Sequence, residues 1–266
     1  MPNEILPILK EVAQVPGLLK QIYGDLARPG VTQVGKALGA VLGLGNTLLW
    51  PLALLNERSK IALEKNLEKY REQLSTASPE KIVEVPPEVG VPITEKLTYV
   101  TDDQLSDLYV NLLAKASVFE SAHTAHPSFV NVINNLSPDE ALLLQQIRGD
   151  IPFLEARIIK GIKNGVKEWI TLGQLLTGLE TKTKLSFPQN IVAYMSNFEG
   201  LGLIEIRRDY FMVTQGQYEE LEKIYRPELD KISNLMKIGT LNFERGRINL
   251  TPYGSLFIAA CFSKQK

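Results

Sequence analysis

The residues that could support chemistry are few and do not form a complete catalytic set. His123 and His126 are the only histidines, and their close spacing could bind a metal ion weakly. Cys261 is the only cysteine, so neither a cysteine pair nor a third histidine is available to complete a zinc site. We therefore expect an ordinary loop between helices at the two histidines, and no bound metal.

Cys261 itself is expected to be a small buried hydrophobe, because Ile258, Ala259 and Ala260 precede it and Phe262 follows. A single cysteine excludes an internal disulfide and predicts a reducing, cytoplasmic location. The sequence has no nucleophile motif, phosphate-binding loop or catalytic carboxylate pair. We predict no enzymatic activity and no cofactor.

A glycine-rich apolar stretch is the feature that most affects the predicted function. Residues 37–56 (ALGAVLGLGNTLLWPLALLN) carry no formal charge, although 22% of the chain is charged. A helix of that length could span a hydrocarbon core of roughly 30 Å. Gly35, Gly39 and Gly43 recur every fourth residue, so they would line one helix face and let another helix approach closely.

Two interpretations of this stretch stay open. In the first, it is a buried helix that packs against an amphipathic helix over residues 3–27. In the second, it enters or crosses the inner membrane after a trigger, with Trp50 at the interface, where aromatic side chains are enriched. Pro51 would bend or end the helix.

A second candidate site consists of arginines near the ends of predicted strands. Arg207, Arg208, Arg245 and Arg247 could contact phosphates or a protein partner. A protein that reads duplex DNA needs basic residues on the helix in the major groove, but the candidate helix, residues 188–199, has no lysine or arginine. We therefore expect a structural or protein-binding module, with DNA binding as the alternative.

The first half of the chain is predicted to be helical. The pattern over residues 57–74 is amphipathic, and its apolar positions form a packing stripe. This stripe consists of Leu63, Leu67, Tyr70 and Leu74. Four prolines in residues 79–92 predict an extended connector. A capping box at residues 101–104 and a helix start at Ser137-Pro138 follow.

The second half mixes helices and strands. Residues 163–165 predict a hairpin turn, residues 171–179 and 188–199 short helices, residues 202–206 a strand, and residues 217–237 a longer helix. Residues 241–250 predict a hairpin around a tight turn at 244–247, and residues 252–262 a closing helix. This order resembles a winged-helix module with an insertion.

We thus expect a mainly α fold of the α+β class. Residues 1–78 would form an N-terminal helical region with a helical hairpin, residues 79–136 a proline-rich connector and helical middle, and residues 137–266 a winged-helix-like domain.

Several stretches together resemble one known family. They include LARPGVTQVGKALGAVLGLGNTLLWPLALLNE, KNLEKYREQL, EKIVEVPPEVGVPITEKL, LSDLYVNLLAKAS, HPSFVNVINNLSPDEA and INLTPYGSLFIAACF. These are similar to the bacterial abortive-infection alpha (Abi-alpha) family, over roughly residues 20–262. The resemblance implies a bacterial or prophage-borne protein linked to phage defence. It carries over no catalytic residue.

Two functional hypotheses follow. In the first, the protein is a phage-defence effector whose glycine-rich helix perturbs the inner membrane when triggered. In the second, it is a soluble interaction or regulatory protein, and the same helix is core or oligomer interface. Both imply a protein partner or self-association, and neither requires nucleic acid. The trigger is not encoded in any motif.

Overall fold

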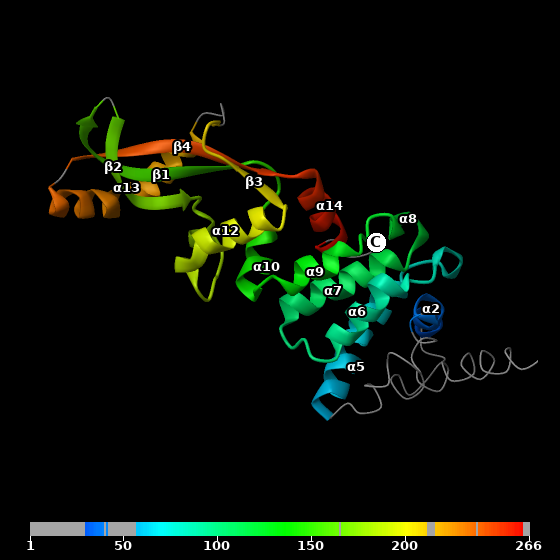
Figure 1. Cartoon of the computed structure of the whole chain (residues 1–266). Helices are drawn as coiled ribbons and strands as arrows, with labels where there is room; N and C mark the ends of the chain where they lie inside the picture. Colours follow the sequence, from blue (N-terminus) through cyan, green and yellow to red (C-terminus); the bar gives the residue numbers. More distant parts are fainter. Residues whose placement is uncertain are drawn as a thin grey trace, which may run out of the picture. The chain divides into compact units, whose positions relative to one another are not determined.

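The computed structural model describes residues 30–39, 41, 57–164, 166–211, 216–237 and 239–262. The chain divides into two compact units (Figure 1). The first comprises residues 1–138 and 256–266, and the second comprises residues 139–255. The predicted helix over residues 3–27 lies outside the described residues, as do Gly43, Trp50 and Pro51.

The first unit is a cluster of helices. Its elements are α2 (Val31–Ala37), α5 (Glu57–Leu74), the 3₁₀ turn η2 (Pro79–Lys81), α6 (Pro87–Leu97), α7 (Asp103–Ala116), α8 (Phe119–Ala122), α9 (Ser128–Asn134) and, from Leu256 on, α14 (Pro252–Cys261). The helical character predicted for the first half is therefore confirmed over the described residues.

The core of the first unit lies where α5 and α6 pack on α7. The stripe predicted on α5 is confirmed, because Leu63, Leu67, Tyr70 and Leu74 are all buried. The Tyr70 hydroxyl shares a hydrogen bond of 2.5 Å with the Ser117 hydroxyl, so its polar end is satisfied inside the core.

Two local predictions for this unit are wrong. The sequence predicts an extended chain throughout residues 79–92, but α6 begins at Pro87 and contains Pro92. Pro87 falls in the first turn, where a helix does not need the missing N–H, and buried Val89 and Ile93 stabilise the helix around Pro92. The cap of α7 is Asp102 rather than Thr101: its carboxylate accepts the Leu105 N–H at 3.0 Å.

The second unit is built on a four-stranded antiparallel sheet. Its strands are β1 (Ile151–Lys163), β2 (Val166–Leu176), β3 (Ile204–Arg207) and β4 (Thr240–Leu250), in the order β2-β1-β4-β3. Its helices are α10 (Pro138–Leu144), α11 (Leu179–Lys182), the 3₁₀ turn η3 (Pro188–Asn190), α12 (Ile191–Gly200) and α13 (Gln217–Met236). The predicted α+β class is confirmed.

The long helix α13 lies against the sheet (Figure 1). Leu154 of β1 packs against Tyr218 and Leu221 of α13, and Leu176 and Phe243 extend this contact. Alternate residues of a strand share one face, so the buried Leu154, Ala156 and Ile158 form one face of β1.

The predicted turn between β1 and β2 is confirmed, because the two strands pair as far as Lys163 and Val166. Two other predictions are wrong. Residues 171–176 belong to β2 rather than to a helix. β4 runs without a turn at residues 244–247, because β1 pairs with it along most of its length. Gly246 serves packing here, since a side chain at this position would collide with the Phe153 ring.

Within the described part of the chain, no helix combines the length and the hydrophobicity that crossing a bilayer requires. This statement does not extend to most of the glycine-rich stretch, because residues 40 and 42–56 lie outside the described residues.

Candidate functional site

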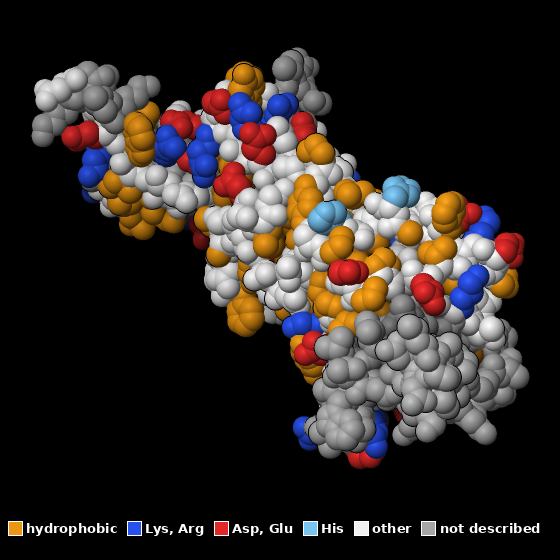
Figure 2. All heavy atoms as spheres, turned by 45° about the vertical axis from the view of Figure 1, so that its right-hand side comes forward, with side chains coloured by type: hydrophobic (Ala, Val, Ile, Leu, Met, Phe, Trp, Pro, Cys, Tyr) orange, Lys and Arg blue, Asp and Glu red, His pale blue; other side chains and the backbone are white. Residues whose placement is uncertain are grey.

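The histidines and the cysteine form no reactive centre in the described residues. Both histidine side chains lie at the surface (Figure 2). His126 Nδ1 accepts the Ser128 N–H at 3.2 Å and lies 2.6 Å from the Ser128 hydroxyl. No group of three or more metal-ligating side chains gathers among the described residues. Cys261 is fully buried, and this burial raises the pKa of its thiol well above the ordinary value.

The described part of the glycine-rich segment packs against the first unit. Val34, Ala37 and Val41 are buried, and the Ala37 carbonyl accepts the Val85 N–H at 2.8 Å. Val41 fills the space that a side chain at Gly90 of α6 would occupy. This part of the segment therefore lies against protein.

The predicted glycine face is only partly visible. Gly35 and Gly39 are both half-buried. A Cβ atom added to Gly39 would lie 3.0 Å from a carboxylate oxygen of Glu84, so a larger residue would have to displace that side chain.

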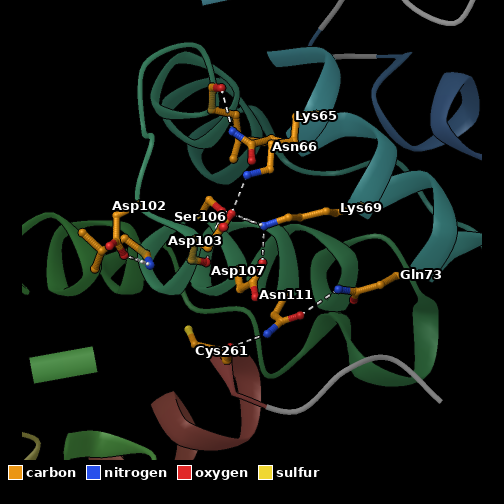
Figure 3. Close-up of polar contacts among 12 residues, drawn as sticks. Lys65, Asn66, Lys69, Gln73, Asp102, Asp103, Ser106, Asp107, Asn111 and Cys261 are labelled. Carbon is orange, nitrogen blue, oxygen red and sulfur yellow. Dashed lines mark hydrogen bonds and ion pairs between the residues drawn. The ribbon is translucent and has the colours of Figure 1, made fainter. Parts of the chain in front are cut away.

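A polar network joins α5 to α7 (Figure 3). Lys69 Nζ lies 3.1 Å from Asp103 Oδ1, 2.6 Å from Asp107 Oδ1 and 3.0 Å from the Ser106 hydroxyl. Lys65 also binds Asp103, and the hydrogen bonds from both lysines lower the pKa of that carboxyl. The charges in this network are directed at one another, so we interpret it as a helix-to-helix attachment.

A second set of hydrogen bonds between α5 and α7 reaches the C-terminal helix. Gln73 donates to Asn111 at 2.7 Å, and Asn111 donates to the Cys261 carbonyl at 2.7 Å (Figure 3). Asn111 thus ties the last turn of α14 to α7, and the network is structural.

Two of the predicted arginines come together on the second unit. Arg207 of β3 stands opposite Arg247 of β4 in the strand register, so both project from the same face of the sheet. The ring of Tyr210 lies beside them and is 54% exposed. Its centroid is 4.6 Å from the Arg207 guanidinium and 6.0 Å from that of Arg247.

Of the other two arginines, Arg245 lies on the same face and Arg208 does not. Arg245 lies two residues from Arg247 on the same face of β4, and its guanidinium is 5.0 Å from the Tyr218 ring of α13. Arg208 instead reaches Glu155 of β1, with 2.8 Å between its Nε and the carboxylate. We call Arg207, Arg245, Arg247 and Tyr210 the arginine surface.

Carboxylates already neutralise the arginine surface. Arg207 pairs with Glu205 at 3.2 Å and with Asp209 at 3.1 Å. Arg247 pairs with Asp150 at 3.5 Å, and Arg245 with Glu219 at 3.0 Å. Acidic and basic side chains accordingly alternate over the second unit in Figure 2. The arrangement fixes the guanidinium groups and leaves little net charge.

A buried ion-pair cluster on β1 was missed by sequence reasoning. Glu155 is 5% exposed and accepts hydrogen bonds from Arg208 and, at 2.7 Å, from Arg157. Arg157 also pairs with Glu244 and lies 4.8 Å from the centroid of the Trp169 ring. The alternation Glu155-Ala156-Arg157 within a strand was the available signal, since it places both charges on one face.

The segment from the end of α11 to the start of α12 was also missed. Residues 181–190 (TKTKLSFPQN), which we call the lysine loop, contain Lys182 and Lys184 and no acidic residue. Phe187 within it is 56% exposed. The absence of acidic residues and the Phe-Pro pair were the signals in the sequence.

The comparisons with known proteins give one result. A model of the abortive infection alpha family matches residues 62–261. The chain belongs to this family. The match covers α6, α7 and the whole second unit, so the arginine surface and the lysine loop both lie within the family region. Searches among curated proteins and among solved structures found no match. Family membership suggests a role in phage defence.

Proposed function

We propose that the chain is a non-enzymatic phage-defence protein that acts by binding a protein partner at the arginine surface. The observation that carries this proposal is the exposed Tyr210 ring between two guanidinium groups that carboxylates hold in place. Tyrosine and arginine are enriched among the residues that dominate binding energy at protein interfaces. Groups fixed before binding lose less entropy when a partner arrives.

The same ion pairs make the arginine surface a poor phosphate site. Proteins bind nucleic acid largely by placing lysine and arginine against phosphates, with release of counterions. Here Arg207, Arg245 and Arg247 are each paired with a carboxylate of the chain. A phosphate would have to displace those carboxylates, so DNA binding is the less favoured alternative.

We further infer that the second unit is an elaborated winged helix. The order β1-β4-β3 within the sheet and the succession α10, α11, α12 before β3 support this inference. β2 and α13 would then be additions, with α13 inserted between the two strands of the wing. In that module the arginine surface would lie on the wing strands.

Phage infection tests the proposed function. Cells carrying the protein should restrict phage plating, and the double variant Arg207→Glu/Arg247→Glu should lose this restriction, because the charge reversal disrupts both guanidinium contacts with Tyr210. The matched control is Lys223→Glu on the exposed side of α13. Both variants should be purified and shown to unfold at the wild-type temperature. Full defence by the folded double variant would refute the proposal.

The uncharged stretch over residues 37–56 favours a second candidate function, perturbation of the inner membrane after a trigger. Because Val34 and Val41 are packed, this function requires release of the segment from the first unit. Replacing Gly39 and Gly43 with leucine should block helix approach and abolish any toxicity. Toxicity that survives both changes would exclude the glycine face as its cause.

A further inference from the structure

The lysine loop presents its side chains to solvent along nearly its whole length. It comprises the end of α11 and the chain up to the start of α12, and eight of its ten residues are exposed. Lys182, Lys184 and Phe187 are all among the exposed residues. A large apolar ring at 56% exposure, within a few residues of two lysines, combines an apolar contact with positive charge.

A buried carboxylate holds the backbone around Phe187 by hydrogen bonds. Asp139 of α10 is 4% exposed and accepts the N–H groups of Ser186 and Phe187, both at 2.8 Å. It also accepts the Tyr194 hydroxyl at 3.0 Å. Pro188 further restricts the backbone of Phe187. The ring is therefore carried on a fixed backbone, which reduces the ordering cost of binding.

The charge of the lysine loop is not neutralised by the described part of the chain. Neither Lys182 nor Lys184 forms an ion pair with any described residue, in contrast to the arginines of β3 and β4. The nearest acidic residue in sequence, Glu180, accepts a hydrogen bond from Tyr225. The loop thus offers positive charge that an anionic surface can use.

We propose that the lysine loop docks the protein on an anionic lipid surface. The Phe187 ring inserts at the boundary between headgroups and acyl chains, and Lys182 and Lys184 lie among the phosphate headgroups. One aromatic ring and two lysines give a weak, reversible contact. This inference does not depend on the arginine surface, and it involves a different part of the molecule from the glycine-rich stretch.

The neighbouring helix explains why lipid fits better than duplex DNA. The exposed side of α12 carries Ala193, Ser196 and Glu199, so it offers no basic side chain to phosphates and no side chain for the bidentate base contacts of a recognition helix. Asn197 donates to Glu140 at 2.7 Å. The exposed Phe187 ring is the feature of this region that matches a lipid interface.

Vesicle binding by the purified full chain tests the proposal. Sedimentation should show binding to vesicles of phosphatidylglycerol and phosphatidylcholine, and weaker binding to phosphatidylcholine alone. Lys182→Ala and Lys184→Ala should each lower the affinity for anionic vesicles about fivefold, from about 1 kcal/mol per basic residue. Phe187→Ala should lower it by roughly tenfold or more, from the lost burial of the ring. Added salt should weaken wild-type binding.

Matched controls separate the loop from general surface effects. Phe119→Ala removes another exposed ring, which is 73% exposed, and Lys223→Ala removes an exposed lysine of α13. Both should bind as the wild type does. The proposal is overturned if folded wild type does not bind, if the loop variants bind as tightly as wild type, or if the controls lose as much affinity. It is also overturned if the loop variants instead abolish binding to a fluorescent DNA oligonucleotide.

Discussion

The two basic surfaces of the second unit differ in how their charges are used. Each arginine of the arginine surface has a carboxylate partner, and Arg207 and Arg245 each have two. The lysine loop has no such partner among the described residues. The number of basic side chains therefore does not identify an anion-binding surface. Pairing within the fold decides whether a positive charge is available to a ligand.

The difference also separates two kinds of recognition. Paired guanidinium groups around Tyr210 form a rigid, nearly neutral surface, which suits the selective contact of a protein partner. Unpaired ammonium groups beside Phe187 suit a surface that is both anionic and apolar. The second unit would therefore select a protein partner at the arginine surface and attach to lipid at the lysine loop.

The largest expected effect comes from removing the buried carboxylate that pairs two arginines. Glu155→Ala leaves Arg157 and Arg208 without their shared partner, and breaking a buried ion pair costs about 3–5 kcal/mol. Because Arg208 is half exposed, we expect the lower end of that range for the free energy of unfolding, measured in urea.

Glu155→Ala should also make positive charge available at a surface where carboxylates otherwise neutralise it. Arg157 keeps its pair with Glu244, but Arg208 loses its carboxylate partner, so Glu155→Ala should bind anionic vesicles more tightly than wild type, with a steep dependence on salt. The control is Glu205→Ala, whose exposed carboxylate shares Arg207 with Asp209 and should cost under about 1 kcal/mol. Equal stability losses in the two variants would contradict the role assigned to Glu155.

The next largest effect concerns the anchor of the lysine loop. Burial raises the pKa of Asp139, but hydrogen bonds from Ser186, Phe187 and Tyr194 outweigh it and hold the pKa below its ordinary value. The stabilisation is therefore complete above the unfolded pKa, about 4, and is lost as pH falls through the folded pKa. Asp139→Asn should cost about 1–3 kcal/mol near neutral pH, and the difference from wild type should shrink in acid.

Two measurements check this anchor. Unfolding in urea at several pH values gives the stability difference, and hydrogen exchange at the Ser186 and Phe187 amides reports the loop directly. Both amides should exchange faster in the variant. Asp209→Asn, an exposed carboxylate, is the control and should leave the exchange unchanged. A stability difference that does not vary with pH would argue against the lowered pKa.

A smaller effect is expected when the paired arginines are removed. Arg207→Ala/Arg247→Ala should lower affinity for anionic vesicles less than about twofold, because carboxylates already neutralise both guanidinium groups. The comparison variant is Lys182→Ala/Lys184→Ala, measured in the same vesicles. Comparable losses of vesicle affinity in the two double variants would show that the arginine surface and the lysine loop do not differ in available charge.

The smallest effect on stability is expected at Tyr210. Its ring is largely exposed, so Tyr210→Ala should change the free energy of unfolding by less than about 0.5 kcal/mol. The same change should weaken defence against phage, because the ring would contact the partner. Phe211→Ala, which removes a ring of similar exposure, should leave defence intact. Loss of defence in both variants would indicate a general disturbance of the chain after β3 and not a specific contact of Tyr210.

Much of the fold could be predicted from local patterns in the sequence. The stripe on α5 and the turn between β1 and β2 were predicted because helix spacing and turn residues are local signals. β2 and β4 were misread because their strand state depends on pairing with distant β1. Gly246 looks like a turn residue, but a glycine is needed there because the Phe153 ring leaves no space for a side chain.

The candidate sites were less predictable for the same reason. The four arginines were found by residue type, but their carboxylate partners include Asp150 and Glu155, which only the folded sheet brings near. Asp139 bonds a loop that lies 47 residues away in sequence. The sequence around it predicts only the start of a helix at Ser137-Pro138. No local pattern reveals that a charge is already paired.

The most direct test of this account places a photo-crosslinking amino acid at Tyr210 or at Phe187, in cells before and after infection. We expect a discrete protein adduct from position 210 that disappears when Arg247→Glu is added. We expect lipid adducts and no discrete protein adduct from position 187. A protein adduct from position 187 with none from position 210 would contradict the assignment of the two surfaces.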